Sequence, residues 1–127
     1  MGPMEQVLAE FGQDIGLTAL APSAQGHVQL RLDSGALLGA STQGEEVVLH
    51  YAEPVEHGAV QLVFAALRRA GRVETAADPL QVGLRSTGQG DWLVVGTRLP
   101  MDRLSVREVH RLAAYLQSWL AQVRQNR

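Results

Sequence analysis

Apolar residues recur at helical spacing in three segments of the chain. Between Met4 and Ile15 they share one face of a helix, and glutamate, glutamine and aspartate share the other. Segment 59–70 carries a second apolar stripe, ends in two arginines and is followed by glycine, which is typical of a helix end. At 105–108, Ser-Val-Arg-Glu forms a capping box ahead of a third stripe that continues close to the C-terminus. The pattern therefore predicts three helices.

Two further segments alternate between apolar and polar residues with a period of two, which predicts strands. In 27–51 the alternation is interrupted by a Ser-Gly pair and a Gln-Gly pair, so we expect three strands joined by tight turns. Pro54 is expected to close this meander. In 80–99 a turn at 86–90 separates two more strands, which predicts a hairpin.

The order of elements predicts an α+β fold: helix, three-strand meander, helix, two-strand hairpin, helix. A chain of 127 residues supplies one core, so we expect a single domain over 1–127. Residues 1–3 precede a second methionine, Met4, and are left out of the fold prediction. An antiparallel sheet with helices mainly on one face buries only that face. Because the sheet edges and outer face stay uncovered, we expect a partner that covers them.

Composition narrows the classes of function. Eleven arginines and no lysine stand against thirteen carboxylates, and a formal charge of −2 argues against nucleic acid as a ligand. The absence of cysteine excludes disulfides, thiolate metal sites and cysteine nucleophiles. No apolar run approaches the ~20 residues of a membrane span, and the N-terminus lacks the pattern of a signal peptide. We therefore expect a soluble cytoplasmic protein that does not bind membranes.

The densest cluster of reactive side chains is His50, Glu53, Glu56 and His57. Two histidines and two carboxylates can bind zinc, but the helical spacing of zinc motifs is absent and Pro54 interrupts the cluster. A solvated loop explains these residues better. The serines lack the glycine pattern of a nucleophile elbow, and no dinucleotide-binding loop is present. We expect no catalytic residue, no metal and no cofactor.

Two segments resemble a known family. Residues 92–104, Trp-Leu-Val-Val-Gly-Thr-Arg-Leu-Pro-Met-Asp-Arg-Leu, are similar to a final strand, an Arg-Leu-Pro-hydrophobic corner and the entry to a last helix. Residues 7–12 and 15–17 are similar to an opening helix and the Gly-containing motif that ends it. These features resemble the class I chaperones of bacterial type III secretion, the Tir-chaperone-like family of small cytoplasmic homodimers. The resemblance covers close to the whole chain.

The resemblance implies a non-enzymatic chaperone. Such a protein binds the N-terminal segment of a secreted effector in extended form, keeps it competent for export and contacts the ATPase of the secretion apparatus. Carried over to this sequence, the first helix, the last helix and the outer face of the meander would contact the effector. The candidate residues are Leu8, Phe11, Val28, Leu30, Leu38, Val48 and Trp119. Val48 and Leu38 are favoured, because we expect both on the face opposite Val47, Leu49 and Leu37.

For the homodimer, the resemblance points to the middle helix and the neighbouring hairpin. Small side chains on that helix would permit close approach around a two-fold axis. The candidate interface residues are Leu62, Val63, Ala66, Leu67, Ala70, Leu84 and Trp92. In the alternative interpretation, the same helix simply covers its own sheet.

Two other functions remain open from the sequence. One is a small hydrolase or isomerase with a cleft between the sheet and the last helix, although catalytic spacing is absent. The other is a dimerising regulatory adaptor that binds a folded partner. An uncovered second face of the meander favours an extended peptide over a folded ligand.

Overall fold

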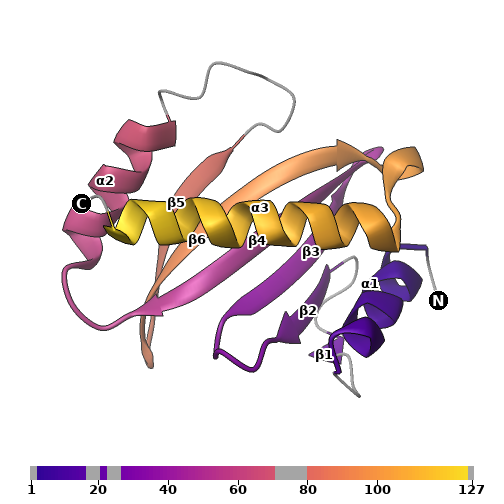
Figure 1. Cartoon of the computed structure of the whole chain (residues 1–127), viewed down its shortest axis with the longest axis horizontal. Coiled ribbons are helices and arrows are strands. Elements are labelled where there is room, and N and C mark those ends of the chain that lie inside the picture. The colour runs from indigo at the N-terminus through magenta and orange to yellow at the C-terminus, as the bar shows by residue number, and fades with distance from the viewer. Residues whose placement is uncertain (1–2, 17–20, 23–26, 71–79, 126–127) are drawn as a thin grey trace.

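The computed structural model describes residues 3–16, 21–22, 27–70 and 80–125. Within them the predicted order of helices and strands is confirmed, with one short strand ahead of the meander (Figure 1). The elements are α1 (Pro3–Asp14), β1 (Ala21–Pro22), β2 (His27–Arg31), β3 (Leu37–Gln43), β4 (Glu46–Val55), α2 (Ala59–Ala70), β5 (Gln81–Thr87), β6 (Gly90–Pro100), a 3-10 turn (Met101–Arg103) and α3 (Val106–Gln125).

All six strands form one antiparallel sheet in the order β1-β2-β3-β4-β6-β5. The longest pairing joins β4 to β6, from Glu46 opposite Pro100 to Val55 opposite Asp91. Strand β4 continues past Pro54, which the sequence predicted as its end. Because β3 pairs with β4 only as far as Ala52, Pro54 lies where the missing N–H interrupts no second ladder.

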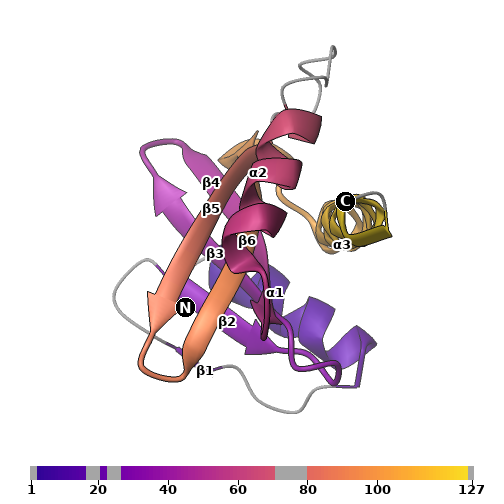
Figure 2. The ribbon, with the colours of Figure 1, turned by 90° about the vertical axis from the view of Figure 1, so that its left-hand side faces the viewer.

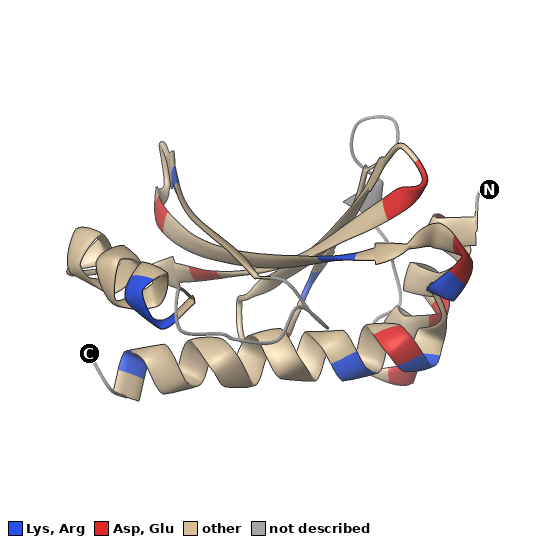
Figure 3. Cartoon of the chain, turned by 90° about the horizontal axis from the view of Figure 1, so that it is seen from above, with Lys and Arg blue, Asp and Glu red and all other residues tan. Residues whose placement is uncertain are grey.

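The helices gather on one face of the sheet, as the sequence predicts. Helix α3 runs across the strands, α1 lies at the β2 end and α2 lies beside β5 (Figure 1). Figure 3 shows α3 beneath the sheet and the strands curving away from it at both ends. Among the described residues, no helix combines the length and the apolar character needed to cross a membrane.

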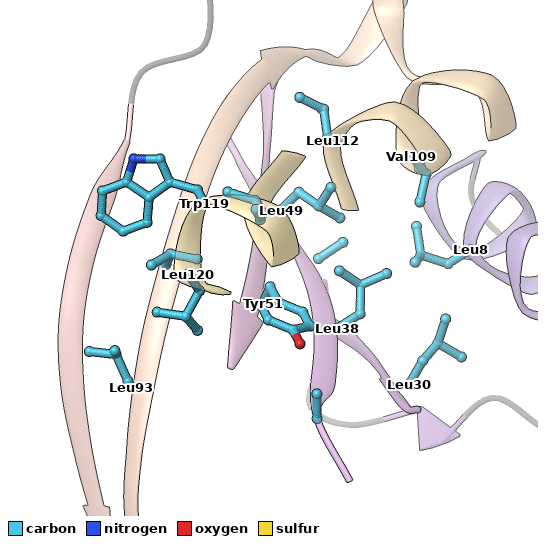
Figure 4. Close-up of a cluster of buried hydrophobic side chains, with 14 of the residues drawn as sticks. Leu8, Leu30, Leu38, Leu49, Tyr51, Leu93, Val109, Leu112, Trp119 and Leu120 are labelled. Carbon is cyan, nitrogen blue, oxygen red and sulfur yellow. The ribbon is translucent and has the colours of Figure 1, made fainter. Parts of the chain in front are cut away.

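Alternate residues of the strands and one stripe of each helix fill the space between the two layers (Figure 4). Leu49, Tyr51, Leu93 and Val95 face the helices from the central strands and are almost fully buried. The side chains that meet them from α1 and α3 include Leu8, Val109, Leu112, Leu116, Trp119 and Leu120. This burial, rather than intrinsic helix propensity, holds the helices on the sheet.

The serine half of the capping box predicted for the last helix is confirmed. The Ser105 hydroxyl accepts a hydrogen bond of 3.1 Å from the backbone N–H of Glu108. The Glu108 carboxylate accepts two hydrogen bonds from Arg111, at 3.0 and 2.9 Å. Hydrogen bonds among residues 105, 108 and 111 therefore stabilise the first turn of α3.

Candidate binding surfaces

The sheet face opposite the helices carries no helix among the described elements (Figure 3). The pairing register brings Arg31, Leu37, Ala52 and Val94 into one row across this face. Trp92 and Arg85 lie opposite each other in the next row. Leu37, Trp92 and Val94 are only half-buried, so this face offers apolar surface that the described part of the chain leaves uncovered.

Two adjoining hollows cross this face. The first has a volume of about 370 Å³ and is lined by Arg31, Leu37, Ala52, Trp92 and the β5–β6 turn. The second has a volume of about 290 Å³ and lies over Val48, His50, Gln81, Gly83 and Gly96. Both include Arg85 and Val94, so they form one continuous depression, which we call the outer trough. Because glycine has no side chain, Gly83 and Gly96 leave the second hollow unfilled.

A histidine pair borders the outer trough. The imidazole rings of His27 and His50 stack with their centroids 5.5 Å apart and their planes at 23°. Gly39 lies opposite His50 in the ladder, and a Cβ there would overlap the His50 ring. Burial, followed by the nearby His27 and Arg85, lowers the pKa of His50 to about 4. The His50 ring is therefore neutral near pH 7.

Six of the seven predicted effector-binding residues lie in the chain's own core. They are at most 7% exposed and pack between the sheet and the helices: Leu8, Phe11, Val28, Leu30, Leu38 and Trp119. Val48 alone among the seven lies on the outer face, where it lines the outer trough.

The pairing register corrects one part of the prediction. Leu38 lies opposite Tyr51 and therefore faces the helices, whereas Leu37 lies opposite Ala52 on the outer face. Leu38 and Val48 thus point to different sides of the sheet, although the alternation in the sequence predicted the same side for both. Alternation defines two faces within one strand, but only the pairing shows which residues of neighbouring strands share a face.

The predicted dimer residues divide into buried and accessible groups. Leu62 and Ala66 are completely buried, because they hold α2 on its own sheet. Val63, Ala70 and Trp92 are half-buried. Leu67 and Leu84 are 48% and 39% exposed. The predicted interface therefore included residues of the side of α2 that packs on the sheet, such as Leu62, and residues of its exposed side, such as Leu67.

The outer side of α2 carries two exposed residues that the prediction missed. Val60 and Phe64 are each 55% exposed and share one helical face with Leu67. Helix α2 packs beside β5, whose Leu84 is also exposed (Figure 2). We call Val60, Phe64, Leu67 and Leu84 the α2 patch. The spacing 60, 64, 67 is visible in the sequence and could have identified the patch as a second stripe.

The candidate metal cluster is divided by the sheet. His50 faces the outer trough, whereas Glu53 lies on the helix side, where it accepts hydrogen bonds from Tyr51 Oη at 2.5 Å and Arg124 Nε at 2.8 Å. Burial and the bond to Glu53 raise the pKa of Tyr51. Within 3–16, 21–22, 27–70 and 80–125, no three His, Asp or Glu side chains are grouped to hold a metal ion.

The enzymatic alternative placed a cleft between the sheet and the last helix. Most of that space is occupied by core side chains, including Leu49, Leu93, Leu116 and Leu120, which have no exposed surface (Figure 4). At its margin, one hollow of about 300 Å³ lies between β4 and α3 and is lined by Ser34, Ala36, Tyr51, Glu53, Pro54 and Gln117. The hollows on the opposite face are lined by arginine, histidine, tryptophan and aliphatic residues. This arrangement suits binding of a ligand that has both apolar and charged groups.

Several solved structures share the fold, including three complexes. A chain in the HopA1–SchA chaperone–effector complex has 21% identity and a TM-score of 0.59, with 96% of this chain and 93% of that chain covered. A chain in the complex of the Yersinia pestis type III secretion chaperone SycH with a fragment of YscM2 has 17% identity and a TM-score of 0.63, over 93% and 97%. A chain in the ExsC–ExsE complex has 15% identity and a TM-score of 0.61, over 92% and 87%.

No curated protein sequence matches the chain. A family model does, and it covers residues 6–127, which include every helix and strand except the first turn of α1. The match confirms the resemblance that the final strand and the opening helix suggested. The chain belongs to the Tir chaperone protein (CesT) family.

Proposed function

We propose that this protein is a type III secretion chaperone that binds the N-terminal segment of a secreted effector and keeps it competent for export. The observation that carries the proposal is the family match over residues 6–127. The uncovered outer face of the sheet supports it, because an extended segment can bind there without opening the core. In this proposal the protein binds the effector in the bacterial cytoplasm and catalyses no reaction.

The outer trough and the free edge of the sheet provide the contacts for an extended segment. Strand β5 forms one edge of the sheet and can add a strand through backbone hydrogen bonds. Val48 in the trough is accessible to the side chains of such a segment. The six buried candidates become accessible only if a helix moves, so we assign the first contact to Val48 and its neighbours.

Two copies of the chain associate in this proposal through the α2 patch. Leu67 and Leu84 come from the predicted interface, and Val60 and Phe64 extend it over the same side of α2. Burying such side chains yields about 25 cal/mol per Å² of apolar surface. The dimer presents two copies of the outer trough to one effector and forms the unit that contacts the secretion ATPase.

Co-purification tests the proposal. The probe is the first ~100 residues of the secreted protein encoded nearest the gene, a length ample to wrap a domain in extended form at about 3.3 Å per residue. We expect it to co-purify with the wild-type chain. Val48→Asp should reduce recovery at least about tenfold, because a charged, hydrated carboxylate replaces an apolar contact with the segment.

Thr42→Asp is the matched control, because it adds the same charge at an exposed end of the same sheet. It should leave recovery unchanged. Circular dichroism checks that both variants fold. Failure of the wild-type chain to retain any such fragment, or equal effects of the two variants, contradicts the proposal.

A further inference from the structure

We propose that the outer trough selects acidic segments: Arg31 and Arg85 bind carboxylates of the partner, and Trp92 and Val94 hold its apolar side chains. The inference rests on the proposed function, since it takes the occupant to be an extended protein segment. It adds the chemical class of that segment, which family membership does not specify.

The first argument is the placement of the two arginines. Arg31 comes from β2 and Arg85 from β5, at opposite sides of the sheet, yet both line the hollow of about 370 Å³. Like charges on the rim of one concave surface repel each other, and concave apolar walls reduce the screening by water. A carboxylate bound between them removes that repulsion.

The second argument is the contrast with other arginines of the fold. Arg111 pairs with Glu108, Arg124 with Glu53 and Arg98 with Glu46. Among the described residues, no hydrogen bond or ion pair engages Arg31 or Arg85. In a chain of net charge −2, two exposed guanidinium groups that form no ion pair with another described residue mark a site complementary to carboxylates.

The third argument is the apolar floor. Between the two arginines lie Leu37, Ala52, Trp92 and Val94, and the trough continues from there over Val48. A bare anion would leave this apolar surface exposed to water. An extended segment instead places alternate side chains about 6–7 Å apart on one face, so apolar and acidic groups reach the trough together.

Other occupants fit less well. A phosphate backbone needs many basic groups, and the described outer face carries three arginines, one of which lies 3.9 Å from Glu46. A second copy of this chain would bring two positive faces together. It has a more suitable surface in the α2 patch, which is apolar and carries no charge.

The test measures fluorescence anisotropy of labelled 15-residue peptides with the full-length wild-type chain. One peptide alternates leucine and aspartate with serine spacers, the second has asparagine for aspartate, and the third has lysine. We expect the aspartate peptide to bind at least about tenfold more tightly than its asparagine isostere, and the lysine peptide not to bind.

Charge reversal assigns the effect to the trough. Arg31→Glu and Arg85→Glu should each lower the affinity for the aspartate peptide at least about tenfold. Each should also reduce the preference of the chain for the aspartate peptide over the asparagine peptide. Arg103→Glu is the matched control, because this exposed arginine lies in the 3-10 turn and the charge change is the same. It should leave the affinity within about twofold.

Equal binding of the aspartate and asparagine peptides overturns the inference, and so do equal effects of Arg103→Glu and Arg85→Glu on peptide binding. Displacement of the peptide by millimolar phosphate or by a 12-nucleotide single strand also overturns it. The same holds if Arg85→Glu changes the molecular mass in solution, because the face is then an interface between copies of the chain. The two proposals fail separately. Retention of an effector fragment that ignores both arginine substitutions overturns only the acidic preference. Binding of acidic peptides without retention of any effector fragment overturns only the secretion role.

Discussion

At the scale of single residues, Gly39 shows how one missing side chain shapes the binding face. The His50 ring occupies the position that a Cβ at 39 would need, and it stacks there on His27. We predict that Gly39→Ala displaces the ring and lowers the free energy of unfolding by about 1–3 kcal/mol, the usual range for overpacking. Urea denaturation followed by circular dichroism measures the change.

Two further variants separate this clash from a general effect of alanine. Gly83 lies on the same face with nothing near its hypothetical Cβ, so Gly83→Ala should be neutral or slightly stabilising. Adding His50→Ala to Gly39→Ala removes the obstructing ring and should restore most of the lost stability. If both glycine substitutions destabilise the fold equally, the ring is not the cause.

The residue scale is also where sequence patterns reach their limit. Alternation within β3 and β4 was predicted correctly, but the assignment of Leu38 to the outer face was wrong because it depends on the register between the strands. The positions of Arg31 and Arg85 in one hollow depend on pairings across five strands. No local pattern contains that information, so the trough could not be predicted from the sequence.

At the scale of elements, the C-terminal end of α3 is attached to β4 by a small polar network. Arg124 donates to the Glu53 carboxylate at 2.8 Å and to the Pro54 carbonyl at 3.2 Å, and Tyr51 donates to the other Glu53 oxygen. These partners lie about 70 residues apart in the chain. The network therefore fixes the position of the last helix turns against the central strand.

We predict that Arg124→Ala destabilises the fold by about 1–2 kcal/mol, because it leaves a partly buried carboxylate with one hydrogen-bond donor fewer. The loss is modest since Arg124 is itself partly exposed. Amide hydrogen exchange should accelerate in the last turns of α3 before it does in the first. Arg107→Ala, at an exposed position of the same helix, is the control and should change neither quantity.

The elements themselves were largely predictable, because each has a local cause. The capping box marks the start of α3, and the glycines at 35 and 44, with φ of 91° and 62°, make the turns of the meander. The continuation of β4 past Pro54 was not predictable, because it depends on where β3 stops pairing. The two-residue strand β1 carries too short a pattern to be distinguished from a linker.

At the scale of the whole molecule, two surfaces of different chemistry stay uncovered by residues 3–16, 21–22, 27–70 and 80–125. The α2 patch is apolar, and the outer trough combines apolar side chains with arginines. The sequence correctly predicted an uncovered outer face, because three helices on one side of an antiparallel sheet cannot cover its other side. It did not separate the inner from the outer side of α2, since both sides carry apolar residues and only packing on β5 and β6 distinguishes them.

The last prediction concerns the α2 patch as a two-fold interface. Leu67→Asp should convert a dimer into single chains of 13.7 kDa, because a carboxylate replaces one of the patch's central apolar contacts on both copies at once. Light scattering after size exclusion measures the mass, and circular dichroism verifies folding. Gln61→Asp introduces the same charge at an exposed position of the same helix and should leave the dimer intact. A wild-type chain that is monomeric, or a Leu67→Asp variant that still forms dimers, assigns the patch to another partner.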